Sequence, residues 1–310
     1  MTTLFLGVDG GGTKTEFVCI DADGRQLATV TTGTTYHLEV GFDEAVRRLA
    51  DGVAAICGKV GCDPAALGHV FFGLPAYGED QEVDPRLHRA CGELLASDRY
   101  SCGNDMVCGW AGSLGCEDGI NIVAGTGSIG YGERLGRTAR AGGWGEIFGD
   151  EGSGYWIAIQ GLTAFARMSD GRAPRGPLHD RITSALSLGT DLDLCERIMG
   201  PHGMGREGIA ALAPVVCAAA ADGDASAQAI LAAAATQLCD LACAIRGSLG
   251  YTSSDVVPLS WSGSILVEVE PVRRQFVELL CNAGDFEIVL PRYTPGYGAA
   301  LYARRAATTT

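Results

Sequence analysis

The chain has 310 residues, with 37 Asp and Glu against 23 Lys and Arg, which gives a formal net charge of −14 at pH 7. This length is about twice that of a typical domain, so two domains are expected, and the 47% hydrophobic content can supply both cores. The negative charge argues against nucleic-acid binding, which requires clustered Lys and Arg. No uninterrupted apolar run reaches about 18 residues and no basic stretch precedes a hydrophobic one at the N-terminus, so we expect neither a membrane span nor a secretory signal.

Twelve cysteines are scattered along the chain. No Cys-x-x-Cys pair and no His at zinc-binding spacing accompanies them, so a structural zinc site is not expected. Several fall within apolar helical or strand patterns, as Cys239 and Cys243 do on one expected helix. We therefore expect reduced, mostly buried cysteines in a cytoplasmic protein.

The N-terminal part begins with an apolar run that ends at Asp9, breaks into three glycines and resumes as a strand to Ile20. Turn residues at 21–24 then predict an antiparallel meander. Further along this part, apolar residues at helical spacing, together with Pro85 in a first helical turn, predict helices. Short buried apolar runs predict strands. The expected elements are strands at 4–9, 12–20, 26–32, 68–75 and 99–105, a loop at 34–41, and helices at 42–59 and 84–96.

The second part repeats this organisation and adds helices. A strand over 119–124 enters a glycine-rich turn, a hairpin follows, and Ser153 is a plausible N-cap after a long glycine-rich loop. The expected elements are the hairpin at 131–140, the loop at 142–152, helices at 153–168, 178–188, 191–199, 206–221, 225–249, 269–282 and 298–305, and strands at 255–261 and 286–290.

Each half thus contains a strand that feeds a glycine-rich turn, at Gly10–Gly12 and at Gly125–Ser128. Bare backbone N–H groups in such turns can approach an anion without interference from side chains, although a plain hairpin would explain either turn alone. The only Gly-Lys pair, Gly58-Lys59, lacks the Ser or Thr of a P-loop. The dinucleotide fingerprint at 125–130 is disfavoured because the glycine-rich residues after it form a poor helix.

Five motifs occur in order and at fitting separations: Asp9-Gly-Gly-Gly-Thr-Lys-Thr15, Asn104-Asp105, Gly125-Thr-Gly-Ser128, Gly142-Gly-Trp-Gly145 and Gly149-Asp-Glu-Gly-Ser153. Together they resemble the N-acetylglucosamine kinase branch of the BadF/BadG-type ATPases, within the actin-like ATPase superfamily. The resemblance spans residues 5 to about 302. It implies an α/β fold of two actin-like (ribonuclease H-like) domains with a cleft between them. We expect domains at 1–115 and 116–295, the second with a helical insertion, and a final helix at about 296–310 that packs back on the first.

The resemblance also implies ATP and Mg²⁺ as cofactors and an amino sugar as the small-molecule partner. Asp105 corresponds to the general base that accepts the proton of the sugar 6-hydroxyl, and Asp9 corresponds to the carboxylate that holds Mg²⁺ through water. The expected phosphate-binding residues are Gly10, Gly11, Gly12, Thr13, Lys14, Gly125, Thr126, Gly127 and Ser128. The expected adenosine-side residues are Gly263 and Ser264, and the expected sugar-binding residues are Tyr36, Asn104, Asp105, Gly143, Trp144, Gly145 and Asp150.

Structural alternatives accompany three of these assignments. Asn104-Asp105 could cap a helix that begins near Met106. Trp144 could be a core residue whose flanking glycines permit close packing, and Asp150 could interact with the dipole of the helix that begins at Ser153.

One departure from the family pattern concerns specificity. Tyr36 stands where related enzymes carry an Asn that contacts the sugar. The expected reaction is therefore phosphorylation of an amino sugar at its 6-hydroxyl, with N-acetylglucosamine first and glucosamine or N-acetylmuramic acid as alternatives. Dimers are usual in this family, so a homodimer is expected.

A second function class remains open. The same family includes activator ATPases that drive electron transfer through an iron–sulfur cluster held between subunits, and Cys102, Cys108 and Cys116 are the nearest candidate ligands, without a clustered pattern. A non-catalytic sugar sensor is disfavoured because both phosphate loops and Asp105 are present.

Overall fold

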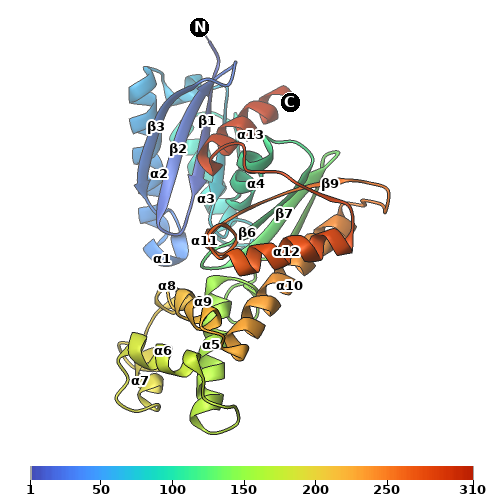
Figure 1. The fold of residues 1–310 in the computed structure, drawn as a ribbon. Helices are drawn as coiled ribbons and strands as arrows, with labels where there is room; N and C mark the ends of the chain where they lie inside the picture. The colour runs from blue at the N-terminus through green and yellow to red at the C-terminus, as the bar shows by residue number, and fades with distance from the viewer. Residues whose placement is uncertain (1, 310) are drawn as a thin grey trace. The chain divides into compact units, whose positions relative to one another are not determined.

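Two five-stranded sheets with flanking helices make up the computed structural model, which describes residues 2–309 (Figure 1). The strands are β1 Leu4–Gly10, β2 Lys14–Asp21, β3 Gln26–Gly33, β4 His69–Leu74, β5 Tyr100–Asn104, β6 Gly119–Ala124, β7 Ser128–Arg134, β8 Arg137–Gly142, β9 Val257–Ser262 and β10 Phe286–Ile288. The helices are α1 His37–Val40, α2 Phe42–Val60, α3 Asp84–Leu95, α4 Met106–Leu114, α5 Gly154–Ser169, α6 Pro177–Leu186, α7 Asp193–Met199, α8 Arg206–Ala210, α9 Ala213–Ala221, α10 Ala225–Ser248, α11 Ser264–Glu268, α12 Glu270–Ala283 and α13 Pro295–Thr309, with a 3-10 turn at Pro64–Ala66.

The two sheets have the same strand order. The first runs β3-β2-β1-β4-β5 and the second, read from its other edge, runs β8-β7-β6-β9-β10. Each is therefore a three-strand meander extended by two later strands beside its first strand. The α/β fold class, with two related halves, is confirmed.

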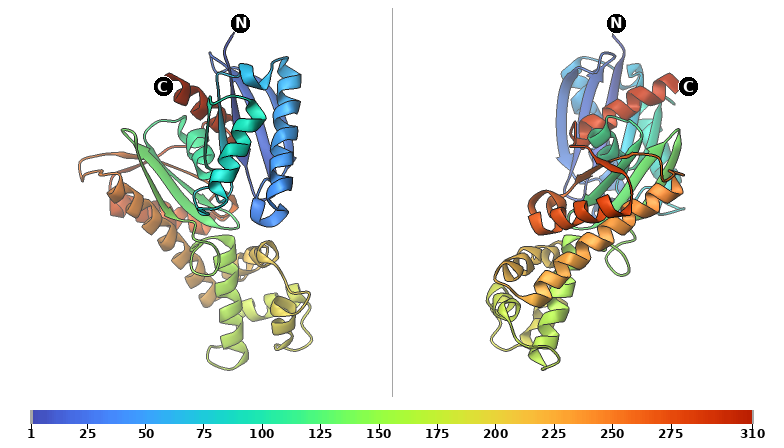
Figure 2. Two further views of the ribbon diagram at one scale, coloured as in Figure 1. Left: turned by 180° about the vertical axis from the view of Figure 1, so that it is seen from behind. Right: turned by 45° about the vertical axis from the view of Figure 1, so that its right-hand side comes forward.

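The chain folds into two compact units, one of Met1–Asn121 with Val289–Thr310 and one of Ile122–Ile288. In the first unit, β1 is antiparallel to β2 and parallel to β4, and β4 is parallel to β5. Helices α2 and α3 cover one face of this sheet, and α4 and α13 cover the other (Figure 2). The three parallel strands end at one edge, where ligands of open α/β sheets commonly bind.

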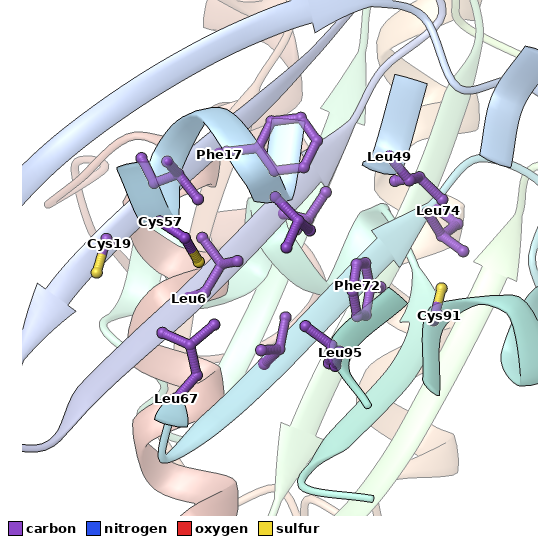
Figure 3. Close-up of a cluster of buried hydrophobic side chains, with 14 of the residues drawn as sticks. Leu6, Phe17, Cys19, Leu49, Cys57, Leu67, Phe72, Leu74, Cys91 and Leu95 are labelled. Carbon is purple, nitrogen blue, oxygen red and sulfur yellow. The ribbon is translucent and has the colours of Figure 1, made fainter. Parts of the chain in front are cut away.

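The hydrophobic core between this sheet and α2 explains why apolar residues alternate with other residues along the first strands. Leu6, Phe17 and Phe72 project from three adjacent strands toward Leu49 of α2, and all four are fully buried (Figure 3). Alternate strand residues point to one face, so β1 and β2 present these side chains to α2. This packing holds the β1–β2 turn at the sheet edge.

In the second unit, α10 packs against β7, β8 and α12, and it also packs against α5 and α9. By length and composition alone α10 could cross a membrane. Its buried residues lie along one side, and they include Leu231, Leu238 and Ile245. These contacts make it a core helix of this unit.

Several sequence expectations needed correction. The helix expected at 206–221 is two helices, because the chain turns at Ala211–Leu212 before Pro214 enters the first turn of α9. The loop expected at 34–41 contains the single turn α1, and a short helix, α11, precedes α12. Short helical turns carry too little periodicity to be recognised from sequence.

Candidate active site

The turn between β1 and β2 is tight and leaves backbone donors open. The Gly11 N–H donates to the carbonyl of Lys14 at 2.8 Å, which closes the turn. Within residues 2–309, the N–H groups of Gly12 and Thr13 have no acceptor. Gly12 and Thr13 are exposed, and a Cβ built on Gly12 would meet no atom within 4 Å, so an anion can approach this turn.

A neighbouring loop fastens this turn. The Thr34 hydroxyl donates to the Gly11 carbonyl at 2.7 Å, and the hydroxyls of Thr35 and Thr15 lie 3.0 Å apart. Thr34 and Thr35 are buried, whereas Tyr36, at the N-cap of α1, is half-buried. The structure thus brings Tyr36 beside the first glycine turn.

Two carboxylates interact at the carboxyl ends of the parallel strands. Asp9 is the penultimate residue of β1, and Asp105 follows β5 directly. Burial, followed by the negative charge of Asp105, raises the pKa of Asp9 to about 7. The thiol of Cys108, which is completely buried, hydrogen-bonds with Asp9 and lies 3.6 Å from the Val8 carbonyl. The ionised form of Asp9 is therefore poorly stabilised by the protein alone.

Asn104 and Asp105 have different surroundings. The Asn104 side chain accepts from the Met106 N–H at 3.1 Å and donates to the Tyr77 carbonyl at 3.3 Å. Asp105 occupies the N-cap position of α4, but its side chain makes no capping hydrogen bond. Helix capping therefore does not account for the Asp105 carboxylate.

The donor set of the first unit fits a hydrated Mg²⁺. Magnesium is usually held by one or two carboxylates, water and substrate phosphates. The raised pKa of Asp9 marks a carboxylate whose ionised form a divalent cation would stabilise. Within residues 2–309 no three His, Cys, Asp or Glu side chains converge as a preformed metal site, which is compatible with binding through water and phosphate.

The turn between β6 and β7 is built like the first. The carbonyls of Gly125 and Thr126 accept from the N–H groups of Gly154 and Tyr155, in the first turn of α5. Ser153 caps that helix by accepting from Trp156 N–H, as its sequence position predicts. In the described part of the chain, the N–H groups of Thr126 and Gly127 have no acceptor.

Asp150 is bound within the second unit by two groups. It is buried and has a left-handed backbone with φ 59°. Its carboxylate accepts from the Ser128 N–H at 3.2 Å and from Arg206 Nη2 at 2.6 Å. Both contacts connect Asp150 to the second glycine turn.

The glycine-rich loop before α5 exposes its large side chains. Trp144 is 71% exposed, and Ile147 and Phe148 are more exposed still. Trp144 is therefore not a core residue. Gly143 and Gly145, on either side of it, have φ values of 68° and 85°, a backbone region that favours glycine.

A cavity of about 280 Å³ lies beside the second glycine turn. Its wall includes Gly125, Thr126 and Ser264, together with the apolar side chains of Pro214 and Ile265. Gly263 directly precedes Ser264 and has a φ of 90°. A Cβ built on Gly263 would lie 2.4 Å from the Ala124 carbonyl oxygen. Of the two expected adenosine-side residues, Ser264 thus lines a partly apolar hollow and Gly263 is its direct neighbour in the chain.

The expected site residues therefore form two sets. The first unit brings together Asp9, Gly10–Lys14, Tyr36, Asn104 and Asp105, and the second holds Gly125–Ser128, Gly143–Gly145, Asp150, Gly263 and Ser264. Sequence reasoning missed Thr34 and Arg206, and it considered Cys108 only as a cluster ligand, whereas all three contact these site residues. No local pattern marks such partners, since each lies far along the chain from the group that it contacts.

Comparison with known proteins gives one family over nearly the whole chain. Residues 6–303 match the BadF/BadG/BcrA/BcrD ATPase family. The chain is 31% identical to an N-acetyl-D-glucosamine kinase of Dictyostelium discoideum, with 97% of each chain covered. It is 30% identical to an N-acetylmuramic acid/N-acetylglucosamine kinase of Clostridium acetobutylicum, covering 96% of this chain and 97% of that one.

Solved structures give the same result for the fold. A candidate N-acetylglucosamine kinase from Chromobacterium violaceum superposes with a TM-score of 0.71 at 25% identity, covering 98% of this chain and 99% of that one. A ROK family glucokinase from Streptomyces griseus, solved with glucose and AMPPNP, has a TM-score of 0.56 at 19% identity, covering 97% and 99%. With two glycine turns on two matching sheets and a family match from residue 6 to residue 303, the chain belongs to the BadF/BadG/BcrA/BcrD ATPase family.

Proposed function

We propose that this protein is an ATP-dependent kinase that transfers the γ-phosphoryl group to the 6-hydroxyl of an amino sugar, with N-acetylglucosamine as the preferred substrate. The observation that carries the proposal is the Asp9–Asp105 pair beside a turn with open N–H groups. Two relatives at 30% identity or above bear amino-sugar kinase names.

In this reaction Asp105 accepts the proton of the attacking hydroxyl while the oxygen forms a bond to the γ-phosphorus and the bond to ADP breaks. General-base assistance of this kind contributes roughly 10²–10⁴-fold. The carboxylate suits this role because it does not cap α4.

Phosphoryl transfer otherwise requires phosphates to be held and their charge to be neutralised. Gly12 and Thr13 in the first unit, and Thr126 and Gly127 in the second, offer backbone N–H groups for this purpose. Lys14 adds an exposed cation beside the first turn. Asp9 would hold Mg²⁺ through water, and the ion would supply charge neutralisation at the phosphates.

Sugar recognition is assigned to Tyr36, Asn104 and Asp105 in the first unit and to the loop around Trp144 in the second. An exposed indole flanked by glycines can cover a sugar ring while backbone groups bond its hydroxyls. Tyr36 carries a phenol, and its backbone N–H donates to the Thr34 hydroxyl that binds the glycine turn. It is the residue that we expect to separate N-acetylglucosamine from glucosamine and N-acetylmuramic acid.

We further propose a cytoplasmic homodimer. The twelve cysteines, all free, support a reducing compartment. The homodimer rests on the family resemblance, and light scattering on the purified protein tests it.

The positions of the cysteines do not favour the activator-ATPase alternative, which needs a cysteine that can bind an iron–sulfur cluster shared between subunits. Cys108 is completely buried against Val8 and Asp9 and cannot reach a partner subunit. Cys102, in β5, and Cys116, in the turn after α4, are both half-buried.

The deciding experiment measures ADP release with N-acetylglucosamine, glucosamine, N-acetylmuramic acid, glucose or no sugar, and locates the phosphate on the product by phosphorus NMR. We expect one amino sugar to be strongly preferred, with the phosphate on its 6-oxygen. Asp105→Asn should lower kcat by at least about 10²-fold, whereas Asp98→Asn, on the exposed turn before β5, should not. Equal ATP hydrolysis with and without sugars would overturn the proposal.

A further inference from the structure

The Arg206 guanidinium lies directly on the second glycine turn. A Cβ built on Gly127 would be 2.5 Å from Arg206 Nη2 and 2.9 Å from the nearer Asp150 carboxylate oxygen. The same Nη2 donates to Asp150 at 2.6 Å, and Arg206 Nε lies 3.4 Å from a carboxylate oxygen of Glu146. The guanidinium thus packs against the turn at a fixed place.

The anchoring carboxylate is more buried than the arginine that it holds. The Asp150 side chain is 3% exposed and the Arg206 side chain 39% exposed. Asp150 also accepts from the Ser128 N–H, so one carboxylate fixes both the turn and the guanidinium. This arrangement orients Arg206 before any ligand arrives.

Arg206 retains donors for a ligand. A guanidinium has five N–H donors, and the contacts of Arg206 use Nη2 and Nε only. Within residues 2–309, Nη1 has no acceptor, like the neighbouring N–H groups of Thr126 and Gly127. Three sets of donors without partners therefore gather at one accessible turn, in a chain with net charge −14.

We propose that Arg206 binds the polyphosphate of the nucleotide, with Asp150 as the residue that positions it. Arginine suits this role because its planar fork matches phosphate oxygens and it stays charged at all working pH values. The inference rests on the proposed ATP binding. Arg206, in α8, would supply the positive charge at the second glycine turn. Asp150 would then take part in nucleotide binding by positioning Arg206.

The test compares nucleotide with nucleoside, because a phosphate contact affects only the former. Dissociation constants for ADP and for adenosine would be measured for wild type, Arg206→Gln and Arg206→Lys, at fixed Mg²⁺ and without sugar. Arg181→Gln is the matched control, since Arg181 forms an exposed ion pair with Asp222 elsewhere in the second unit.

We expect Arg206→Gln to weaken ADP binding roughly 10–100-fold, the usual loss for one hydrogen bond to a charged group, with adenosine binding changed by less than about twofold. Arg206→Lys should recover part of the loss, and the control should match wild type. Equal weakening of ADP and adenosine, or no weakening of either, would overturn the proposal. If Arg206→Gln does not fold, the ADP-to-adenosine ratio for Arg206→Lys decides in the same way.

Failure of the kinase proposal would be visible separately. Wild-type protein that binds ADP but phosphorylates no sugar contradicts the kinase assignment and leaves the Arg206 comparison valid. Wild-type protein that binds adenosine and ADP equally contradicts the Arg206 proposal.

Discussion

At the scale of single residues, the site depends on one carboxylate, that of Asp9, whose ionised form the fold stabilises poorly. Asp9 is partly buried beside Asp105 and the Cys108 thiol, and its pKa is raised to about 7. An acid whose folded-state pKa lies above its unfolded value loses stability as pH rises between the two values. The fold would be more stable without the Asp9 carboxylate, so we attribute its presence to function.

Asp9→Asn should consequently stabilise the protein and abolish activity. The shift from 3.8 to about 7 corresponds to at most ~4 kcal/mol, and we halve this to ~2 kcal/mol because Asp9 is partly exposed. Thermal unfolding at pH 8 without divalent ions measures the gain, which should vanish near pH 4. A lower melting temperature for the variant at pH 8 would contradict this account.

Substitution of Gly12 tests whether a phosphate group binds in the open space beside the first glycine turn. Gly12→Ala places a methyl group where no protein atom lies within 4 Å, so stability should change by less than about 0.5 kcal/mol. ADP affinity should fall about tenfold, as for the loss of one hydrogen bond to a charged group. Gly58→Ala, on the exposed side of α2 and equally open, should leave ADP binding intact. Unchanged ADP binding in Gly12→Ala would exclude this turn from the nucleotide site.

At the scale of elements, the N-terminus of α5 supports the second glycine turn. Gly154 and Tyr155 donate to the turn carbonyls, and Ser153 caps the same helical end. Because the first N–H groups of a helix have no intrahelical acceptor, they are available for such contacts. The turn and the helix are thus one structural unit.

Ser153→Ala should therefore affect both stability and nucleotide binding. Loss of the cap costs about 1 kcal/mol, measurable by urea unfolding, and a frayed first turn should weaken ADP binding. Ser184→Ala, at an exposed site within α6, provides the control. Weakened stability with unchanged ADP binding would show that the cap and the turn are independent.

At the scale of the whole molecule, the end of the chain completes the first unit. α13 packs against β1, β2, β4 and α4 through very close backbone approaches. A Cβ on Gly7 would lie 2.0 Å from the Ala300 nitrogen, and one on Gly298 would lie 2.1 Å from the Gly112 nitrogen. On this face of the first sheet, α13 therefore completes the cover that α4 provides in part.

Truncation after Tyr293 should expose this face and destabilise the first unit selectively. Hydrogen exchange of the β1 amides should become fast, while β7 in the second unit stays protected. Truncation after Thr308 is the control. Native-like protection of β1 in the shorter chain would show that α13 is dispensable.

The sequence by itself determined most strands and helices and the identity of the motif residues, whereas the strand order of the two sheets came from the structure. Alternating apolar residues define β1 and β2, and the glycine runs after Asp9 and Ala124 define the turns, because these signals are local. The break at Ala211–Leu212 was missed because local periodicity continues across it, and α11 was missed because so short a helix carries too little periodicity.

Only the tertiary structure decided how the site residues are held. Trp144 is exposed although its glycine-flanked sequence also fits a core residue. Asp150 contacts Ser128 and Arg206, which lie 22 and 56 residues away along the chain. Such pairings depend on which elements the fold places side by side, and no spacing within one element encodes them.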